Sequence, residues 1–251
     1  MYLLSSRIAA ILLAAILALS AAACRTEEPQ QVGTAPGEAY TTGEPQQEDG
    51  SGRFYMGREI ATITGHDSAE WLERPSREQT ELPSRVLHGL ALRPEEVVAD
   101  IGAGTGYFSL RIAEKVPEGR VYAVDVQSEM LELLEQRIGE QGIENVVPVL
   151  GTPTRPNLPP SSIDVALMVD AYHEFSHPRE MMEEIVESLK PGGRVVVVEY
   201  RAEDPTIPVK PVHRMSEEQV RREMETVGLT WVESKEILPQ QHFIVLEKPS
   251  R

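Results

Sequence analysis

From residue 94 onward, short apolar runs alternate with longer stretches in which apolar residues recur at helical spacing. The runs predict strands and the stretches predict helices, and this regular alternation is typical of crossover units that build a parallel sheet. The expected strands are residues 97–101, 120–126, 146–150, 163–169 and 194–200. The expected helices are residues 105–116, 128–141 and 179–190.

The pattern changes near the C-terminus. Residues 216–227 predict a helix, because Ser216 and Gln219 form a capping box and Gly228 follows the last turn. Two apolar runs, 229–238 and 241–247, then flank a tight turn. We therefore expect an α/β fold in which a mostly parallel, seven-stranded sheet has helices on both faces and a C-terminal antiparallel hairpin.

The N-terminal third has a different pattern. Residues 24–52 are rich in Gly, Pro, Gln, Glu and Thr and almost lack large aliphatic residues, which predicts a flexible linker. In residues 53–93 apolar positions return at helical spacings that Pro75 and Pro83 interrupt. This segment predicts two or three short helices packed in front of the main domain, residues 94–251.

Residues 1–23 combine one charge, Arg7, with an apolar run and small residues, a pattern typical of a secretory signal peptide and short for a membrane span. Cys24, the single cysteine, directly follows three alanines and resembles the cysteine of a bacterial lipobox, although Ala21 stands where leucine is usual. The resemblance implies an exported lipoprotein of the cell envelope, anchored to the membrane through Cys24. Cleavage without lipidation is the alternative.

Composition narrows the possible partners. Forty acidic residues against 24 basic ones give a formal net charge of −16, and no run of Lys or Arg offers a basic patch, so a nucleic-acid partner is not expected. A single cysteine excludes an internal disulfide framework and a zinc site with several thiolates. No metal is expected either.

The segment VVADIGAGTGYFSLRIA, residues 97–113, begins with the first predicted strand and continues into a glycine-rich loop. Glycines between a strand and a helix let the backbone approach a ligand closely. The spacing D-x-G-x-G-x-G differs from the G-x-G-x-x-G of dehydrogenases and resembles motif I of the class I S-adenosylmethionine-dependent methyltransferases. Three further segments resemble that family in the expected order: VYAVDVQ around Asp125, SSIDVALMVDAYHEF from Ser161, and LKPGG at residues 189–193.

The resemblance implies a Rossmann-like fold and S-adenosylmethionine as cofactor. Asp125, at the end of the second strand, would accept hydrogen bonds from the ribose hydroxyls. Thr152 stands where the family often has an acidic residue for the adenine amino group, and it offers only a hydroxyl. The expected cofactor-binding residues are Asp100, Gly102, Ala103, Gly104, Gly106, Asp125, Val126, Thr152 and Asp170.

Candidates for the transfer step follow the fourth strand: Asp170, Tyr172 and His173. His173 is the first choice as a base or as a group that orients the acceptor, because the ordinary pKa of histidine suits the role. The alternative is that His173 only bonds to a neighbouring loop. Further candidates are Glu174, Glu199, Tyr200 and His213, and Tyr55 and Trp71 are candidates for a lid.

The expected function is S-adenosylmethionine-dependent methyl transfer to a small molecule, because the charge disfavours nucleic acid and no second domain is available for a large protein substrate. Two alternatives remain open. The first is an envelope protein that binds S-adenosylmethionine or a nucleoside without catalysis. The second is a nicotinamide oxidoreductase, which the glycine spacing disfavours. The sequence does not indicate the oligomeric state.

Overall fold

The computed structural model describes residues 39–250, and a seven-stranded sheet lies at its centre, in the order β6-β5-β4-β7-β8-β10-β9. Strands β4 to β8 pair in parallel, whereas β10 is antiparallel to both of its neighbours. The predicted fold class is confirmed. The strands are β4 (Val97–Ile101), β5 (Arg120–Asp125), β6 (Val146–Leu150), β7 (Ile163–Val169), β8 (Leu189–Tyr200), β9 (Thr230–Ser234) and β10 (Gln241–Glu247).

The strand order fixes where a ligand can enter. The chain adds β5 and β6 on one side of β4 and then returns to place β7 on its other side. At such a reversal the loops after the strands diverge and leave a crevice at the carboxyl ends. The crevice therefore lies between the loops that follow β4, β5 and β7.

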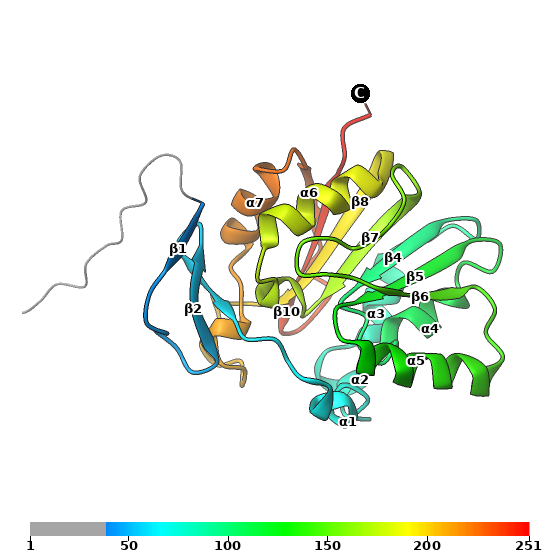
Figure 1. Cartoon of the computed structure of the whole chain (residues 1–251), viewed down its shortest axis with the longest axis horizontal. Helices are drawn as coiled ribbons and strands as arrows, with labels where there is room; N and C mark the ends of the chain where they lie inside the picture. The colour runs from blue at the N-terminus through cyan, green and yellow to red at the C-terminus, as the bar shows by residue number, and fades with distance from the viewer. Residues whose placement is uncertain (1–38, 251) are drawn as a thin grey trace, which may run out of the picture. The chain divides into compact units, whose positions relative to one another are not determined.

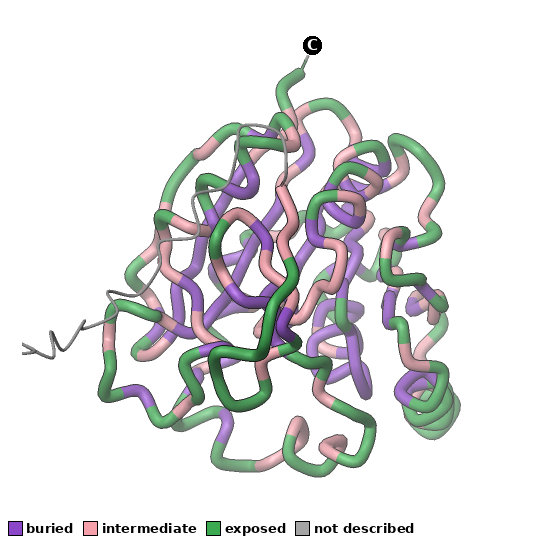
Figure 2. Tube along the Cα trace, turned by 60° about the vertical axis from the view of Figure 1, so that its left-hand side comes forward, coloured by how far each residue is buried: buried purple, intermediate pink, exposed green. Residues whose placement is uncertain are grey.

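Helices cover both faces of the sheet (Figure 1). One face packs against α3 (Pro83–Gly89), α4 (Tyr107–Ala113) and α5 (Ser128–Gln141), and the other against α6 (Pro178–Ser188) and α7 (Glu217–Glu225). Apolar residues on one stripe of each helix and on both faces of the central strands make two buried clusters. The central strands β4, β7 and β10 are accordingly buried along almost their whole length (Figure 2).

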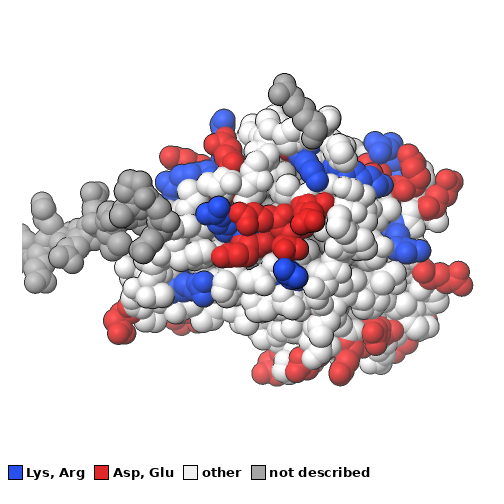
Figure 3. All heavy atoms as spheres, turned by 45° about the horizontal axis from the view of Figure 1, so that its top comes forward, with Lys and Arg blue, Asp and Glu red and all other residues white. Residues whose placement is uncertain are grey.

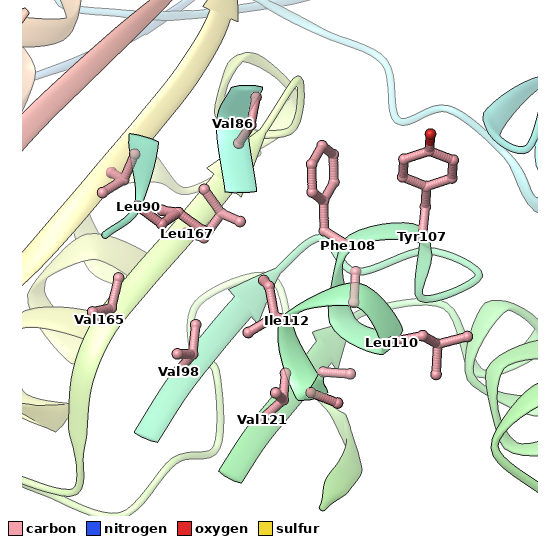
Figure 4. Close-up of a cluster of buried hydrophobic side chains, with 14 of the residues drawn as sticks. Val86, Leu90, Val98, Tyr107, Phe108, Leu110, Ile112, Val121, Val165 and Leu167 are labelled. Carbon is pink, nitrogen blue, oxygen red and sulfur yellow. The ribbon is translucent and has the colours of Figure 1, made fainter. Parts of the chain in front are cut away.

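Figure 4 shows part of the first cluster, in which Phe108 and Ile112 of α4 lie over Val98 and Val121 of the strands. Ile112, Val98 and Val121 have no exposed surface. Burying side chains of this size stabilises a fold by roughly 1.5–3 kcal/mol each relative to leaving them exposed. This packing holds α4, and with it the loop between β4 and α4, in a fixed position.

The β8 strand begins earlier than the sequence predicts. Residues 189–193 resemble a turn, yet Leu189 pairs with Ile163 of β7, and the strand assignment starts there. Gly192, with φ of +75°, lies where the pairing with β7 is irregular, between Ile163 and Val165. The preceding helix ends at Ser188 because Leu189 is already extended.

Two predictions for the N-terminal third are partly wrong: the linker at residues 24–52 and the start of the helical segment at residues 53–93. Residues 40–61 form a three-stranded antiparallel sheet of β1 (Tyr40–Thr42), β2 (Gly50–Tyr55) and β3 (Arg58–Ala61). A two-residue turn joins β2 to β3, and Met56 and Gly57 both have positive φ, as type I′ hairpin turns require. The carboxylate of Glu59 also accepts backbone hydrogen bonds from Gln46 and Gly52, which fixes the β1–β2 connection.

Short helices do follow this sheet: η1 (His66–Ser68), α1 (Ala69–Leu72), α2 (Arg77–Thr80) and then α3. The predicted signal peptide and Cys24 lie outside the described residues. Among residues 39–250, no helix combines the length and the apolar character that crossing a bilayer requires.

Candidate active site

A cavity of about 940 Å³ lies at the carboxyl ends of the central strands. Its walls come from the loops after β4, β5 and β7, from the residues around α1, and from the small sheet, which contributes Ser51, Arg53, Ile60 and Ala61. This volume is within the range of small-molecule and cofactor sites. The segment predicted to be a linker therefore contributes to the site.

The glycine loop presents its backbone to this cavity. Gly102 and Gly104 line it, and both have positive φ, +78° and +54°. A Cβ on Gly102 would lie 2.6 Å from the Cβ of Ala171, so only glycine fits there. The Gly104 amide donates a 2.8 Å hydrogen bond to Asp125 Oδ2, which ties the loop to the end of β5.

Asp125 is 7% exposed and lines the cavity beside Val126. Its Oδ1 accepts a second backbone hydrogen bond, from Gln127 at 2.9 Å. Burial raises the pKa of Asp125, and the backbone donors partly oppose that rise. Each carboxylate oxygen keeps a free lone pair, so the residue fits a pair of ligand hydroxyls.

Asp170 supplies an acceptor that the described chain leaves unused. Its Oδ2 accepts from Gln241 Nε2 at 2.7 Å, but the buried Oδ1 has no hydrogen-bond partner among residues 39–250. Burial and the nearby carboxylates of Glu199 and Glu81 raise the pKa of Asp170 to about 7. An orphaned buried oxygen is costly unless a bound group donates to it. Its place on the cavity wall fits an ammonium or hydroxyl of a ligand.

Histidines 173 and 213 meet on the wall of the same cavity. His173, 3% exposed, is placed by η2 (Tyr172–Glu174), and His213 by η3 (Pro211–His213). His173 Nδ1 lies 2.6 Å from Oε2 of the fully buried Glu199 on β8, and His173 Nε2 lies 3.0 Å from His213 Nδ1. Glu174 lines the cavity beside both rings.

The two rings differ electrostatically. Burial by itself lowers the pKa of His173, but the carboxylates of Glu199, Glu174 and Asp170 outweigh it and raise the pKa overall. Burial and the neighbouring His173 lower the pKa of His213. The hydrogen bond to Glu199 fixes the Nδ1–H tautomer of His173, which leaves Nε2 as an acceptor.

Several predicted cofactor residues support the site without lining it. Asp100 is buried beneath the loop, where it accepts from Ser109 Oγ at 2.6 Å, and burial raises the pKa of Asp100 to about 6. Gly106 packs under Leu134, and Ala103 is likewise outside the cavity wall. Thr152 is held in a turn by Arg155, so Pro153 lines the cavity in its place.

Tyr172 points away from the cavity, contrary to the prediction. Its hydroxyl donates a 2.7 Å hydrogen bond to Glu223 on α7, and Glu223 also pairs with Arg58 on β3 at 2.8 Å. Burial and the Glu223 carboxylate raise the pKa of Tyr172 well above its ordinary value, so it stays protonated. The group therefore links η2 to α7 and β3.

Replacing Tyr172 with phenylalanine is expected to lower the free energy of unfolding by about 1.5–3 kcal/mol, because one buried hydrogen bond to a charged group is lost. Turnover should stay within about twofold, since no cavity contact changes. Chemical denaturation and a methyl-transfer assay on the same preparation measure the two effects. A large loss of turnover at unchanged stability would show that Tyr172 belongs to the active site after all.

Of the two lid candidates, Trp71 lines the cavity, whereas Tyr55 is buried against Thr226. Sequence reasoning missed Arg77 and Arg53, which both line the cavity. Arg53 is the first residue of the segment predicted to form short helices, and it lies instead on the strand β2.

The comparisons with known proteins agree with this geometry. Residues 98–193 match the sequence family described as a methyltransferase domain. An uncharacterized methyltransferase, YcgJ of Bacillus subtilis, is 36% identical over 116 residues, which are 46% of this chain and 45% of the relative. The ubiquinone/menaquinone biosynthesis C-methyltransferase UbiE of Ectopseudomonas mendocina is 30% identical over 111 residues, 43% of each chain. The match thus spans less than half the length of these relatives.

A solved structure supports the fold over a larger region. The S-adenosylmethionine-dependent methyltransferase from Aquifex aeolicus superposes with a TM-score of 0.70 at 24% identity, covering 74% of this chain and 100% of that one. Residues 98–193 thus match a methyltransferase domain on a fold that is shared with an S-adenosylmethionine-dependent methyltransferase, and S-adenosylmethionine is the cofactor that this match and this fold support.

Proposed function

We propose that the protein transfers a methyl group from S-adenosylmethionine to a small molecule bound in the same cavity. One observation carries the proposal: the glycine loop and Asp125 line the same cavity as His173, Glu174 and His213. Asp170 lies on the wall as well. A cofactor half and an acceptor half in one enclosed space are what a direct transfer needs.

The cofactor half binds by backbone and carboxylate groups. Gly102 and Gly104 allow close approach, Asp125 accepts from the ribose hydroxyls, and the orphaned Oδ1 of Asp170 accepts from the ammonium of the amino-acid part. When bound, S-adenosylmethionine supplies an electrophilic methyl group for in-line displacement. The chain's own contribution is to align the acceptor with that group, which is worth roughly 7 kcal/mol or more in well-ordered systems.

The acceptor half favours a small molecule that carries an oxygen or nitrogen. Ile60, Phe175 and Pro208 give it apolar walls, and Arg53 adds a buried Nε that has no hydrogen-bond partner among the described residues. The small sheet contributes to the wall and limits the size of what can enter.

On the face shown in Figure 3, acidic side chains gather in one patch and basic ones are scattered, so that face offers nothing to a nucleic acid.

Calorimetric titration with S-adenosylmethionine and with NADH, followed by a screen of extracts for S-adenosylhomocysteine release, tests the function. We expect binding of the first cofactor only, and product release that depends on the extract. Binding without release from any extract would favour the non-catalytic envelope protein, and NADH binding would favour the oxidoreductase.

We further propose that the protein is exported and anchored to the membrane through a lipid on Cys24, on the basis of the lipobox-like segment. Cys24→Ser is expected to move the protein from the detergent phase to the aqueous phase or to block its processing. Labelling with a fatty-acid analogue measures the modification. A wild-type protein that takes up no label would contradict the anchor.

A further inference from the structure

We infer that His173, Glu174 and His213 bind a divalent first-row transition-metal ion at the acceptor end of the cavity. Two imidazoles and a carboxylate are ligands that such ions prefer, and the set matches the two-histidine, one-carboxylate arrangement of open metal sites. All three side chains line the cavity.

The distances suit one shared ion. His173 Nε2 and His213 Nδ1 are 3.0 Å apart, and two metal–nitrogen bonds of about 2.1 Å spanning that gap meet at roughly 90°, the angle of neighbouring ligands in an octahedron. Glu174 Oε1 lies 3.8 Å from each of these nitrogens. A movement of less than about 1 Å would bring it to bonding distance of the same ion.

The nitrogen of each ring that does not face the other ring indicates where the ring proton lies, and this bears on whether a cation can lie between the two rings. His173 Nδ1 faces Glu199, and His213 Nε2 faces Asp49 Oδ2 at 3.4 Å. A carboxylate accepts hydrogen bonds, so each of these nitrogens should carry the proton of its ring. When both rings are neutral, the nitrogens that face each other across 3.0 Å each carry a lone pair, and two lone pairs so close repel unless a proton or a metal ion lies between them.

Carboxylates behind ligating histidines are typical of protein metal sites, because they fix the tautomer and strengthen the ligand. Glu199 is fully buried and also accepts from the His173 backbone amide, so its position is fixed. Asp49 is held by Lys210 at 2.6 Å. Both histidines therefore have the outer partner that a metal ligand needs.

His173 and His177 have a His-x-x-x-His spacing, yet the cluster joins His173 to His213, 40 residues away, and these two rings meet only through the fold. The coordination positions of the ion that no side chain occupies would face the cavity. There the ion would hold an oxygen or nitrogen of the acceptor, a role that rests on the proposed methyl transfer. The binding of the ion itself does not.

The test is calorimetric titration of the full chain with Co²⁺, without a histidine tag, after chelator treatment and without S-adenosylmethionine. We expect one ion per chain, bound in the micromolar range or tighter. Variants His213→Ala and Glu174→Gln should each weaken binding at least about tenfold, and Glu199→Gln, which touches no ion, about 10–100-fold. The exposed His88 on α3 gives the matched control, and His88→Ala should bind like the wild type.

Stoichiometric binding that His213→Ala loses and His88→Ala keeps supports the site. No binding, or equal binding by these two variants, overturns it, and the rings then share a proton instead. S-adenosylmethionine affinity measured on the same preparations separates the two proposals. Lost cobalt binding at normal cofactor affinity concerns the metal site alone, whereas failure to bind the cofactor with cobalt bound concerns only the methyl transfer.

Discussion

Replacing His173 with alanine is expected to lower turnover by about 100-fold or more, the scale typical of a group that positions or activates a reactant. Affinity for S-adenosylmethionine should be nearly unchanged, because the ring bonds to Glu199 and His213 and not to the glycine loop or Asp125. The reason is geometric: His173 is held on one side by Glu199 and faces His213 on the other. Under the proposed function, its Nε2 would act on the acceptor, either as a base or as a metal ligand.

Single-turnover rates and cofactor titration on one preparation measure both quantities, and His88→Ala serves as the control for loss of a histidine elsewhere. Because His173 is buried, its removal leaves a cavity, so thermal unfolding must show that the variant is folded at the assay temperature. Full activity would show that alignment by the rest of the cavity suffices. Loss of cofactor binding as well would make His173 part of the cofactor wall.

Replacing Asp125 with alanine is expected to weaken S-adenosylmethionine binding at least about tenfold, because hydrogen bonds to a charged group contribute roughly 1.5–3 kcal/mol each. The variant also removes the acceptor for the Gly104 and Gln127 amides, so the loop loses its tie to β5. Calorimetric titration measures the affinity, and chemical denaturation measures the stability.

Asp125→Asn separates these two effects. Its amide oxygen can still accept from one of the backbone amides, so the loop should hold better than in the alanine variant, while the charge-assisted bonds to the ligand are lost. We expect cofactor affinity to fall in both variants and the free energy of unfolding to fall mainly in the Asp125→Ala variant. Wild-type affinity in a folded alanine variant would remove Asp125 from the site.

The sequence by itself determined the main sheet, and it placed the glycine loop and Asp125 at the carboxyl edge of that sheet. Strand periodicity and glycine spacing are local signals, because an apolar run marks a buried strand whichever strand it pairs with, and the loop after β4 is defined within seven residues. Asp125 was identified for the same reason, since it ends a strand that must neighbour β4 in a parallel sheet.

Only the tertiary structure decided which of the residues proposed for the acceptor half meet one another. The β1 strand forms because Tyr40 pairs with Tyr55, a contact that a composition typical of a linker conceals. The direction of Tyr172 depends on Glu223, 51 residues away, and the unpaired oxygen of Asp170 depends on which neighbours the fold supplies. The histidine pair joins loops 40 residues apart. Such long-range contacts have no periodic signature, because each depends on where the whole chain places two loops.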